Sequence, residues 1–138
     1  MPTLLRNASF VIEHYVAQAF VRLARTSEAL PKHAQVVAAL DACRAALGAR
    51  DTSQLAILVD WRLAPLPPPG TEAERDVVAE VEKFGAPFAR RALLLLSAAG
   101  DTAEQAQSGY ERAAKAWAAT QYRVFFDEEQ AIAFVTGG

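Results

Sequence analysis

An unbroken apolar run, Leu55 to Val59, constrains the fold of this chain more than any other stretch. It follows turn-forming residues at positions 51–53, so both faces of a short extended segment have to be buried at once. Burial on both faces is typical of an interior strand in a parallel sheet. We therefore predict that this run is the central strand of an α/β sheet, with Asp60, Trp61 and Arg62 at the carboxyl end, where such sheets commonly bind ligands.

The segments around this run alternate between strand and helix patterns. Two β-rich runs predict an antiparallel hairpin at an edge of the sheet, and they are Ser9–Tyr15 and Phe20–Arg25. Cap and spacing signals predict helices that begin at Pro31, Thr71, Asp101 and Asp127. Further interior strands are expected at Arg91–Ser97 and Gln121–Phe126. The order β-β-α-β-α-β-α-β-α predicts a single mixed α/β sheet with mostly parallel interior strands and helices packed on it.

Length and composition predict one globular domain over residues 1–138. The net charge of −2, with acidic and basic residues interspersed, does not favour nucleic acid as a partner. Cys43 is the only cysteine, which fits a reducing compartment, and the longest apolar runs, such as Ala92 to Leu96, are far too short to span a membrane. Because the N-terminus has no apolar signal-peptide core, we expect a cytoplasmic protein, and the many Ala and Arg residues point to a bacterial one.

No catalytic or cofactor-binding motif stands out, so we do not expect an enzyme. The patterns G-x-G-x-x-G and G-x-S-x-G and the phosphate-binding loop are absent from the sequence. His14 and His33 are not spaced to meet a second ligand, a hydroxyl or a thiol, so neither a metal nor a cofactor is expected. Asp60 and Ser97 match the acceptor Asp and the hydroxyl of a receiver domain, but the acidic pair and the Lys that a receiver also needs are missing.

The polar residues after the central strand have two interpretations. In the structural one, Asp60 caps a local amide, Trp61 shields the sheet edge and Arg62 pairs with a surface acid. In the functional one, Arg62 and the helix that Thr71 caps form a site for an anion or a peptide.

Two other patterns also have a structural and a functional interpretation. The spacing of Tyr110 and Trp117 favours core packing over a ligand box, with Tyr122 as a third aromatic candidate. The doublet Arg90-Arg91 is either a solvated rim or a site for a lipid headgroup.

The layout resembles the STAS domain of anti-sigma-factor antagonists, and more closely the bacterial STAS-like proteins grouped with the CRAL-TRIO lipid-binding fold. Three passages carry the resemblance: the strand Leu55–Asp60, the loop-to-helix junction at Thr71, and the closing segment Phe125–Phe134. The resemblance implies a non-enzymatic regulatory module that acts through a protein partner. The alternative that it implies is binding of a lipid or a small apolar ligand between sheet and helices.

The chain departs from the sporulation-type antagonists at the site of their regulation. Those proteins carry an Asp-Ser-Ser-Gly-like motif before the second helix, and its Ser is phosphorylated. In this chain the loop at residues 63–71 has Thr71 as its only hydroxyl, and Thr71 also caps the helix. Thr71 is therefore the candidate phosphoacceptor, where a phosphate would meet a helix N-terminus.

We expect the partner to dock on the rim beyond the central strand, through Asp60, Trp61, Arg62, Pro68 and Thr71. An exposed Trp and an Arg beside a stiff proline loop are residue types that anchor interfaces. Replacing both Trp61 and Arg62 by Ala should abolish binding and leave circular dichroism and thermal stability nearly unchanged. A large loss of stability would instead mark them as core residues.

A homodimer is a further expectation, through the predicted edge strand at residues 9–15. Such a strand would pair with its own copy along the free backbone groups of the edge.

The substitution Leu58→Asp tests the central strand. It buries an unpaired charge in place of an apolar side chain, so the free energy of unfolding should fall by several kcal/mol. Urea unfolding followed by circular dichroism measures this change. A loss as small as that of a typical surface substitution would contradict the assignment.

Overall fold

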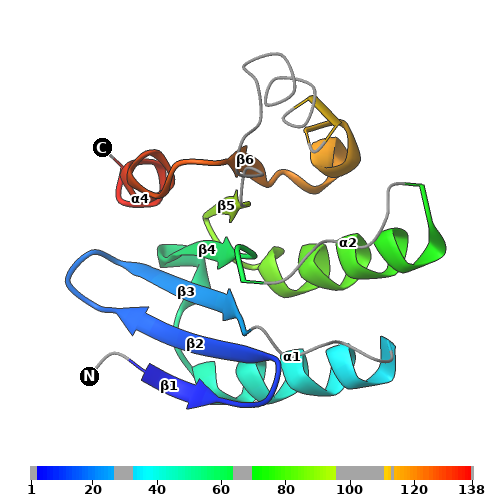
Figure 1. The fold of residues 1–138 in the computed structure, drawn as a ribbon. Helices are drawn as coiled ribbons and strands as arrows, with labels where there is room; N and C mark the ends of the chain where they lie inside the picture. The colour runs from blue at the N-terminus through cyan, green and yellow to red at the C-terminus, as the bar shows by residue number, and fades with distance from the viewer. Residues whose placement is uncertain (1–2, 27–32, 64–69, 96–110, 113, 138) are drawn as a thin grey trace.

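The described strands form one six-stranded mixed sheet with helices on both of its faces (Figure 1). The computed structural model describes residues 3–26, 33–63, 70–95, 111–112 and 114–137. The strands lie side by side in chain order, as β1 (Thr3–Arg6), β2 (Phe10–Tyr15), β3 (Phe20–Arg25), β4 (Ala56–Asp60), β5 (Arg90–Leu94) and β6 (Arg123–Phe125). Helices α1 (His33–Leu47), α2 (Glu72–Gly85) and α4 (Glu128–Val135) pack on this sheet.

The sheet changes from antiparallel to parallel at β3. Strands β1, β2 and β3 pair in antiparallel fashion, whereas β3, β4, β5 and β6 pair in parallel. The predicted α/β class, with a mixed sheet, an N-terminal antiparallel hairpin and parallel interior strands, is confirmed.

The predicted hairpin, β2 and β3, is present but does not lie at the edge of the sheet, because a strand that was not predicted, β1, lies outside it. β1 pairs with β2 on the side away from β3, so β2 has a neighbour on each side. Asn7 closes the turn between β1 and β2, since its Oδ1 accepts hydrogen bonds from the backbone N–H groups of Ser9 (3.0 Å) and Phe10 (2.8 Å). The dimer expected through residues 9–15 therefore lacks the free edge it needed, and β1 is the edge strand instead.

β4 is buried over its whole length, as its apolar run predicted. Each residue from Ala56 to Asp60 is at most 7% exposed, and β4 lies between two parallel neighbours. Alternate side chains face opposite sides of the sheet. Leu58, which is fully buried, belongs to the core that α4 covers, whereas Ile57 and Val59 belong to the core that α1 and α2 cover.

α1 and α2 cover one face of the sheet and α4 covers part of the other (Figure 1). The buried stripe of α1 comprises Val36, Leu40, Cys43 and Leu47, and that of α2 comprises Val77, Val81 and Phe84. Trp117 joins the same core, in a segment that is helical at residues 114–117. On the opposite face, α4 buries Ala131 and Val135 against the sheet.

Local sequence signals fix the helix ends that they predicted. Gly48 has φ +60 directly after α1, a conformation that glycine adopts without strain. The hydroxyl of Thr71 accepts a hydrogen bond from the backbone N–H of Glu74 (3.2 Å), and Asp127 caps α4 in the same way. The predicted helix starts at Pro31 and Asp101 lie outside the described residues. In the part of the chain that is described, no helix is both long and apolar enough to cross a membrane.

The last turn of α2 packs directly on Tyr122, just before β6. The Tyr122 hydroxyl donates a hydrogen bond to the carbonyl of Val81 (3.0 Å), and its ring meets Trp117 edge to face at 5.8 Å. Trp117 and Tyr122 thus pack in the core, as was predicted for Trp117, whereas Tyr110 lies outside the described residues. A methyl group on Gly85 would overlap the Tyr122 hydroxyl and lie 2.6 Å from its Cζ, so only glycine fits there.

The substitution Gly85→Ala should therefore destabilise the fold by about 1–3 kcal/mol, the usual cost of overpacking a core. The change is measured as the free energy of unfolding in urea. The double variant Gly85→Ala/Tyr122→Phe should lose less than the sum of the two single variants, because the overlapping hydroxyl is gone. Strict additivity would show that the two residues do not meet.

Candidate functional site

Asp60 is a nearly buried carboxylate at the carboxyl end of β4. Its side chain is 10% exposed, and it points to the face of the sheet that α4 covers. A carboxylate in this position needs compensation, because burial without a partner strongly disfavours its charge.

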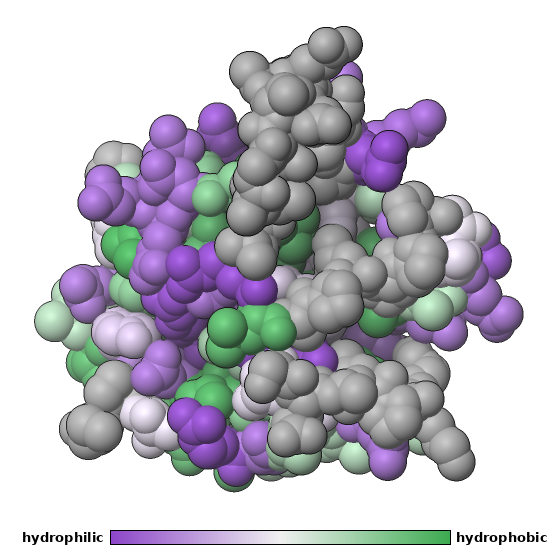
Figure 2. Space-filling view, in the orientation of Figure 1, coloured by the Kyte–Doolittle hydropathy of each residue, from purple (hydrophilic) through white to green (hydrophobic). Residues whose placement is uncertain are grey.

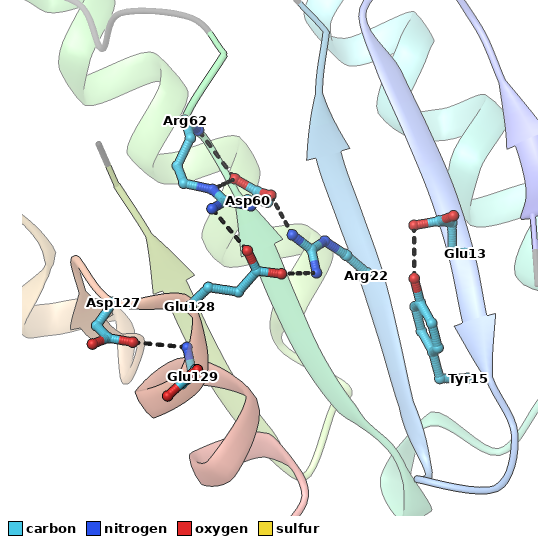
Figure 3. Close-up of polar contacts among 8 residues, drawn as sticks. All are labelled: Glu13, Tyr15, Arg22, Asp60, Arg62, Asp127, Glu128 and Glu129. Carbon is cyan, nitrogen blue, oxygen red and sulfur yellow. Dashed lines mark hydrogen bonds and ion pairs between the residues drawn. The ribbon is translucent and has the colours of Figure 1, made fainter. Parts of the chain in front are cut away.

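Two arginines provide that compensation, one from β3 and one from the segment just after β4 (Figure 3). Arg22 of β3 places Nη2 2.6 Å from Asp60 Oδ2. Arg62 places Nη2 2.8 Å from the same oxygen, and its Nε donates to Asp60 Oδ1 at 2.9 Å. The backbone N–H of Arg62 also donates to Oδ1, at 3.2 Å. Asp60 thus caps a local amide, as the structural interpretation predicted, and holds both guanidiniums.

Glu128, the first residue of α4, closes the cluster from the opposite side. Its Oε1 accepts from Arg22 Nη1 at 3.1 Å, and its Oε2 lies 2.9 Å from Arg62 Nη1. Arg62 therefore pairs with a surface acid, which is the second part of the structural interpretation. We call Arg22, Asp60, Arg62 and Glu128 the four-charge cluster. It connects α4 to the end of β4 and to β3, and its Arg22 and Glu128 are 106 residues apart in the sequence.

The charges of the cluster stabilise one another. Burial alone would raise the pKa of Asp60, but hydrogen bonds from Arg62 and Arg22 outweigh it and lower that pKa below its ordinary value. Burial likewise opposes the charge of Glu128, and the same arginines lower its pKa. The pKa of Arg62 is raised, chiefly by its hydrogen bond to Asp60. All four groups are thus charged at neutral pH.

Trp61 contradicts the prediction of an exposed interface anchor. It is 2% exposed and lies on the other face of the sheet from Asp60, because successive residues of an extended chain alternate. The guanidinium of Arg25 lies 5.3 Å from its ring centre, and Phe10 meets it edge to face at 6.0 Å. Replacing Trp61 by Ala would open a cavity in the core, so the expected unchanged stability is wrong.

Of the other two predicted rim residues, Pro68 and Thr71, the structure describes only Thr71. Pro68 lies outside the described residues. Thr71 is half-buried at the start of α2, and its hydroxyl already accepts the capping hydrogen bond. Glu72 and Glu74 occupy the first turn of α2. A phosphate on Thr71 would meet these two carboxylates as well as the helix N-terminus, so the local charges oppose the modification.

Leu63, immediately after Arg62, is the exposed apolar side chain of this rim. It is 66% exposed, although large apolar side chains are mostly buried in this protein. Val16, the other large apolar side chain exposed in the described part of the chain, is 74% exposed. Val16 precedes the amino end of β3 and Leu63 follows the carboxyl end of β4, so the two lie at opposite ends of a parallel strand pair.

Sequence reasoning missed Arg22 as a partner of Asp60, and Glu128 as a partner of the two arginines. One signal was available for Arg22, which interrupts the apolar residues of an otherwise buried strand. A charge in such a strand predicts a nearby opposite charge. Glu128 gave no comparable signal, since acids in the first turn of a helix are common.

Cys43, Arg90 and Arg91 lie outside the four-charge cluster. Burial raises the pKa of the Cys43 thiol to about 11, so it is not a nucleophile at neutral pH. No group of three or more His, Cys, Asp or Glu side chains that could hold a metal ion occurs among the described residues. Arg90 and Arg91 donate hydrogen bonds to backbone carbonyls, of Phe134 and of Ala86 and Thr120 respectively.

The described strands show no reversal of strand order of the kind that opens a crevice at the carboxyl edge of a doubly wound sheet. That crevice opens where the strand order reverses and successive crossover helices move to opposite faces. Here the strands follow one another in chain order, and α1 and α2 pack in the same core.

No protein-family model, curated protein or solved structure matched this chain. The STAS-like resemblance therefore stays an expectation from the sequence.

His14 of β2 is held in its neutral form. Arg50 Nε donates to His14 Nδ1 at 3.1 Å, and Arg50 also donates to the carbonyls of Ala46 and Leu47 at the end of α1. A proton on Nδ1 would remove this bond and add a charge beside Arg50. Burial first, and Arg50 second, lower the pKa of His14 below 6.5.

The lowered pKa of His14 predicts how stability depends on pH. The unfolded chain takes up this proton at higher pH than the folded one, so the free energy of unfolding should fall as pH drops below about 6.5, and level off below the folded pKa. Urea unfolding between pH 7.5 and 5 measures the slope. His14→Gln should flatten it, and the control His33→Gln, which keeps His14, should not. An unchanged slope in His14→Gln would contradict the assignment.

Proposed function

We propose that this chain is a non-enzymatic, STAS-like regulatory module of a bacterial cytoplasm that acts by docking to a protein partner. The observation that carries the proposal is Leu63, an exposed leucine beside a guanidinium that is already held in place. Arginine is enriched at the centres of interfaces, and the fully buried part of an interface is more apolar than its rim.

The order of the rim supports this proposal. Arg62 is bonded to Asp60 and Glu128 before any partner arrives, so a contact to it costs little side-chain entropy. In Figure 2 hydrophilic residues spread from α4 towards the middle of the face, with small hydrophobic areas between them. A mixed surface of this kind suits a reversible contact better than a permanent one.

The docking surface differs from the one that the sequence predicted. Trp61 leaves it, since that side chain is buried in the core. Arg62 and Leu63 now form its centre, and Thr71 follows eight residues later in the chain. Asp60 supports it from beneath through its bonds to Arg62.

The alternative, a lipid or a small apolar ligand, predicts a different result in a separate experiment. A native mass spectrum of freshly purified protein should then show a bound mass beyond that of the 138-residue chain. A spectrum of the bare chain would count against this alternative.

The docking proposal is tested by placing a photo-crosslinking amino acid at position 63, and as a matched control at position 16, in the native host. We expect one protein to be captured reproducibly from position 63 and not from position 16. Leu63→Asp should abolish co-purification of that protein, and Val16→Asp should not. Both Asp variants should keep their stability within about 0.5 kcal/mol, because both sites are exposed. Equal capture from both positions, or binding that survives Leu63→Asp, would refute the docking surface.

A further inference from the structure

Glu128 is bound in the way that a protein binds an anionic ligand. Each of its two carboxylate oxygens is held by a different arginine, at 3.1 Å from Arg22 Nη1 and 2.9 Å from Arg62 Nη1. Arginine side chains from separate elements that converge on one carboxylate are a usual means of anion recognition. Here the anion belongs to the chain itself (Figure 3).

The exposure of the four side chains rises in one direction through the cluster. Asp60 is 10% exposed, Arg22 13%, Arg62 31% and Glu128 40%. Asp60 therefore fixes the two guanidiniums from beneath, while Glu128 covers them from the solvent side. A change of the Glu128 side-chain rotamer would leave one N–H donor group of each arginine facing outward.

Other contacts hold α4 in place without Glu128. Ala131 and Val135 are buried against the sheet, and Arg90 donates a hydrogen bond to the carbonyl of Phe134 at 3.0 Å. Asp127 caps the first turn through the N–H groups of Glu129 and Gln130. The position of Glu128 can thus be vacated without loss of the helix.

We propose that Arg22 and Arg62 form a binding site for a carboxylate of an acidic segment of the partner, and that Glu128 occupies this site in the free protein. The proposal rests on the docking function above, because Arg62 adjoins Leu63 on the same rim. It adds the chemistry of the group that the partner presents. The incoming carboxylate replaces Glu128 and makes the same two contacts, so the exchange conserves charge.

If Glu128 competes for the site, its removal should raise the affinity for an external carboxylate, which can be measured. An internal carboxylate acts at a high effective concentration, so it weakens the apparent affinity for any external one. The probes are an acetylated and amidated Glu-Glu dipeptide and, separately, inorganic phosphate. Binding is followed by NMR, through the Nε–Hε signals of Arg22 and Arg62 in the full-length protein.

We expect Glu128→Ala to bind the dipeptide at least about tenfold more tightly than the wild type, with shifts at both arginine signals. The matched control is Glu129→Ala, which removes the same charge from the same helical turn. Glu129 points away from the cluster in Figure 3, so this variant should bind as weakly as the wild type. Glu128→Ala/Arg62→Gln should lose the gain.

Each other outcome overturns the proposal. An equal gain in affinity for the dipeptide in Glu128→Ala and Glu129→Ala would reflect overall charge only. No gain in affinity would mean that Glu128 only stabilises the fold. Binding of phosphate without the dipeptide would reject a carboxylate ligand. If Glu128→Ala does not fold, Glu128→Gln, which keeps a neutral side chain of the same shape, is measured instead with the same expectation. Since no partner takes part, failure here leaves the crosslinking test at position 63 unaffected.

Discussion

The charge of Asp60, held inside the protein at the end of a strand that is covered on both faces, governs the carboxyl edge of this sheet. The run that makes β4 an interior strand also carries Asp60 into a place that is 7% exposed. Its charge is retained only because Arg22 and Arg62 lie within 2.8 Å of one oxygen. Removing one partner of such a buried pair typically costs about 3–5 kcal/mol, and less where a partner such as Arg62 reaches solvent.

The compensation of Asp60 has consequences for both layers of the structure. Two arginines exceed one carboxylate by one charge, and Glu128 supplies the missing one from α4. The helix on the second face is thereby joined to the interior strands. Strand alternation sends Trp61 to the first face, where Phe10 and Arg25 enclose it. Among the described residues after β4, Arg62 and Leu63 reach the surface of this edge, which is why the proposed function depends on them.

Features set by local sequence could be predicted, and features set by distant contacts could not. The strand at 56–60, the cap at Thr71 and the left-handed Gly48 each depend on neighbouring residues. β1 was missed because its four residues are too short for a periodic signal. The β2–β3 turn carries Ala19 at φ 58 in place of glycine or asparagine, so the usual hairpin signal is absent although the hairpin forms.

The part of the candidate site that depends on neighbouring residues could likewise be predicted from the sequence. Asp60 and Arg62 are two residues apart, and their position after an apolar run pointed to the sheet edge. The partner Arg22 lies 38 residues away, so its contact with Asp60 depends on the register of β3 and β4. Strand alternation predicts that Trp61 is buried if the extended backbone of β4 continues for one residue beyond Asp60. The backbone N–H of Trp61 does continue that ladder, with a hydrogen bond to the Leu94 carbonyl at 2.9 Å.

The most direct test of this account is the titration of the Asp60 carboxyl carbon by NMR, in the wild type and in Arg22→Gln. The account predicts that the pKa of Asp60 lies below 3.8 in the wild type, because its arginine partners outweigh burial. In Arg22→Gln the pKa should rise, since burial then has one charged partner fewer to oppose it. A wild-type pKa at or above 3.8, or the same value in both proteins, would contradict the claim that these arginines keep Asp60 charged inside the fold.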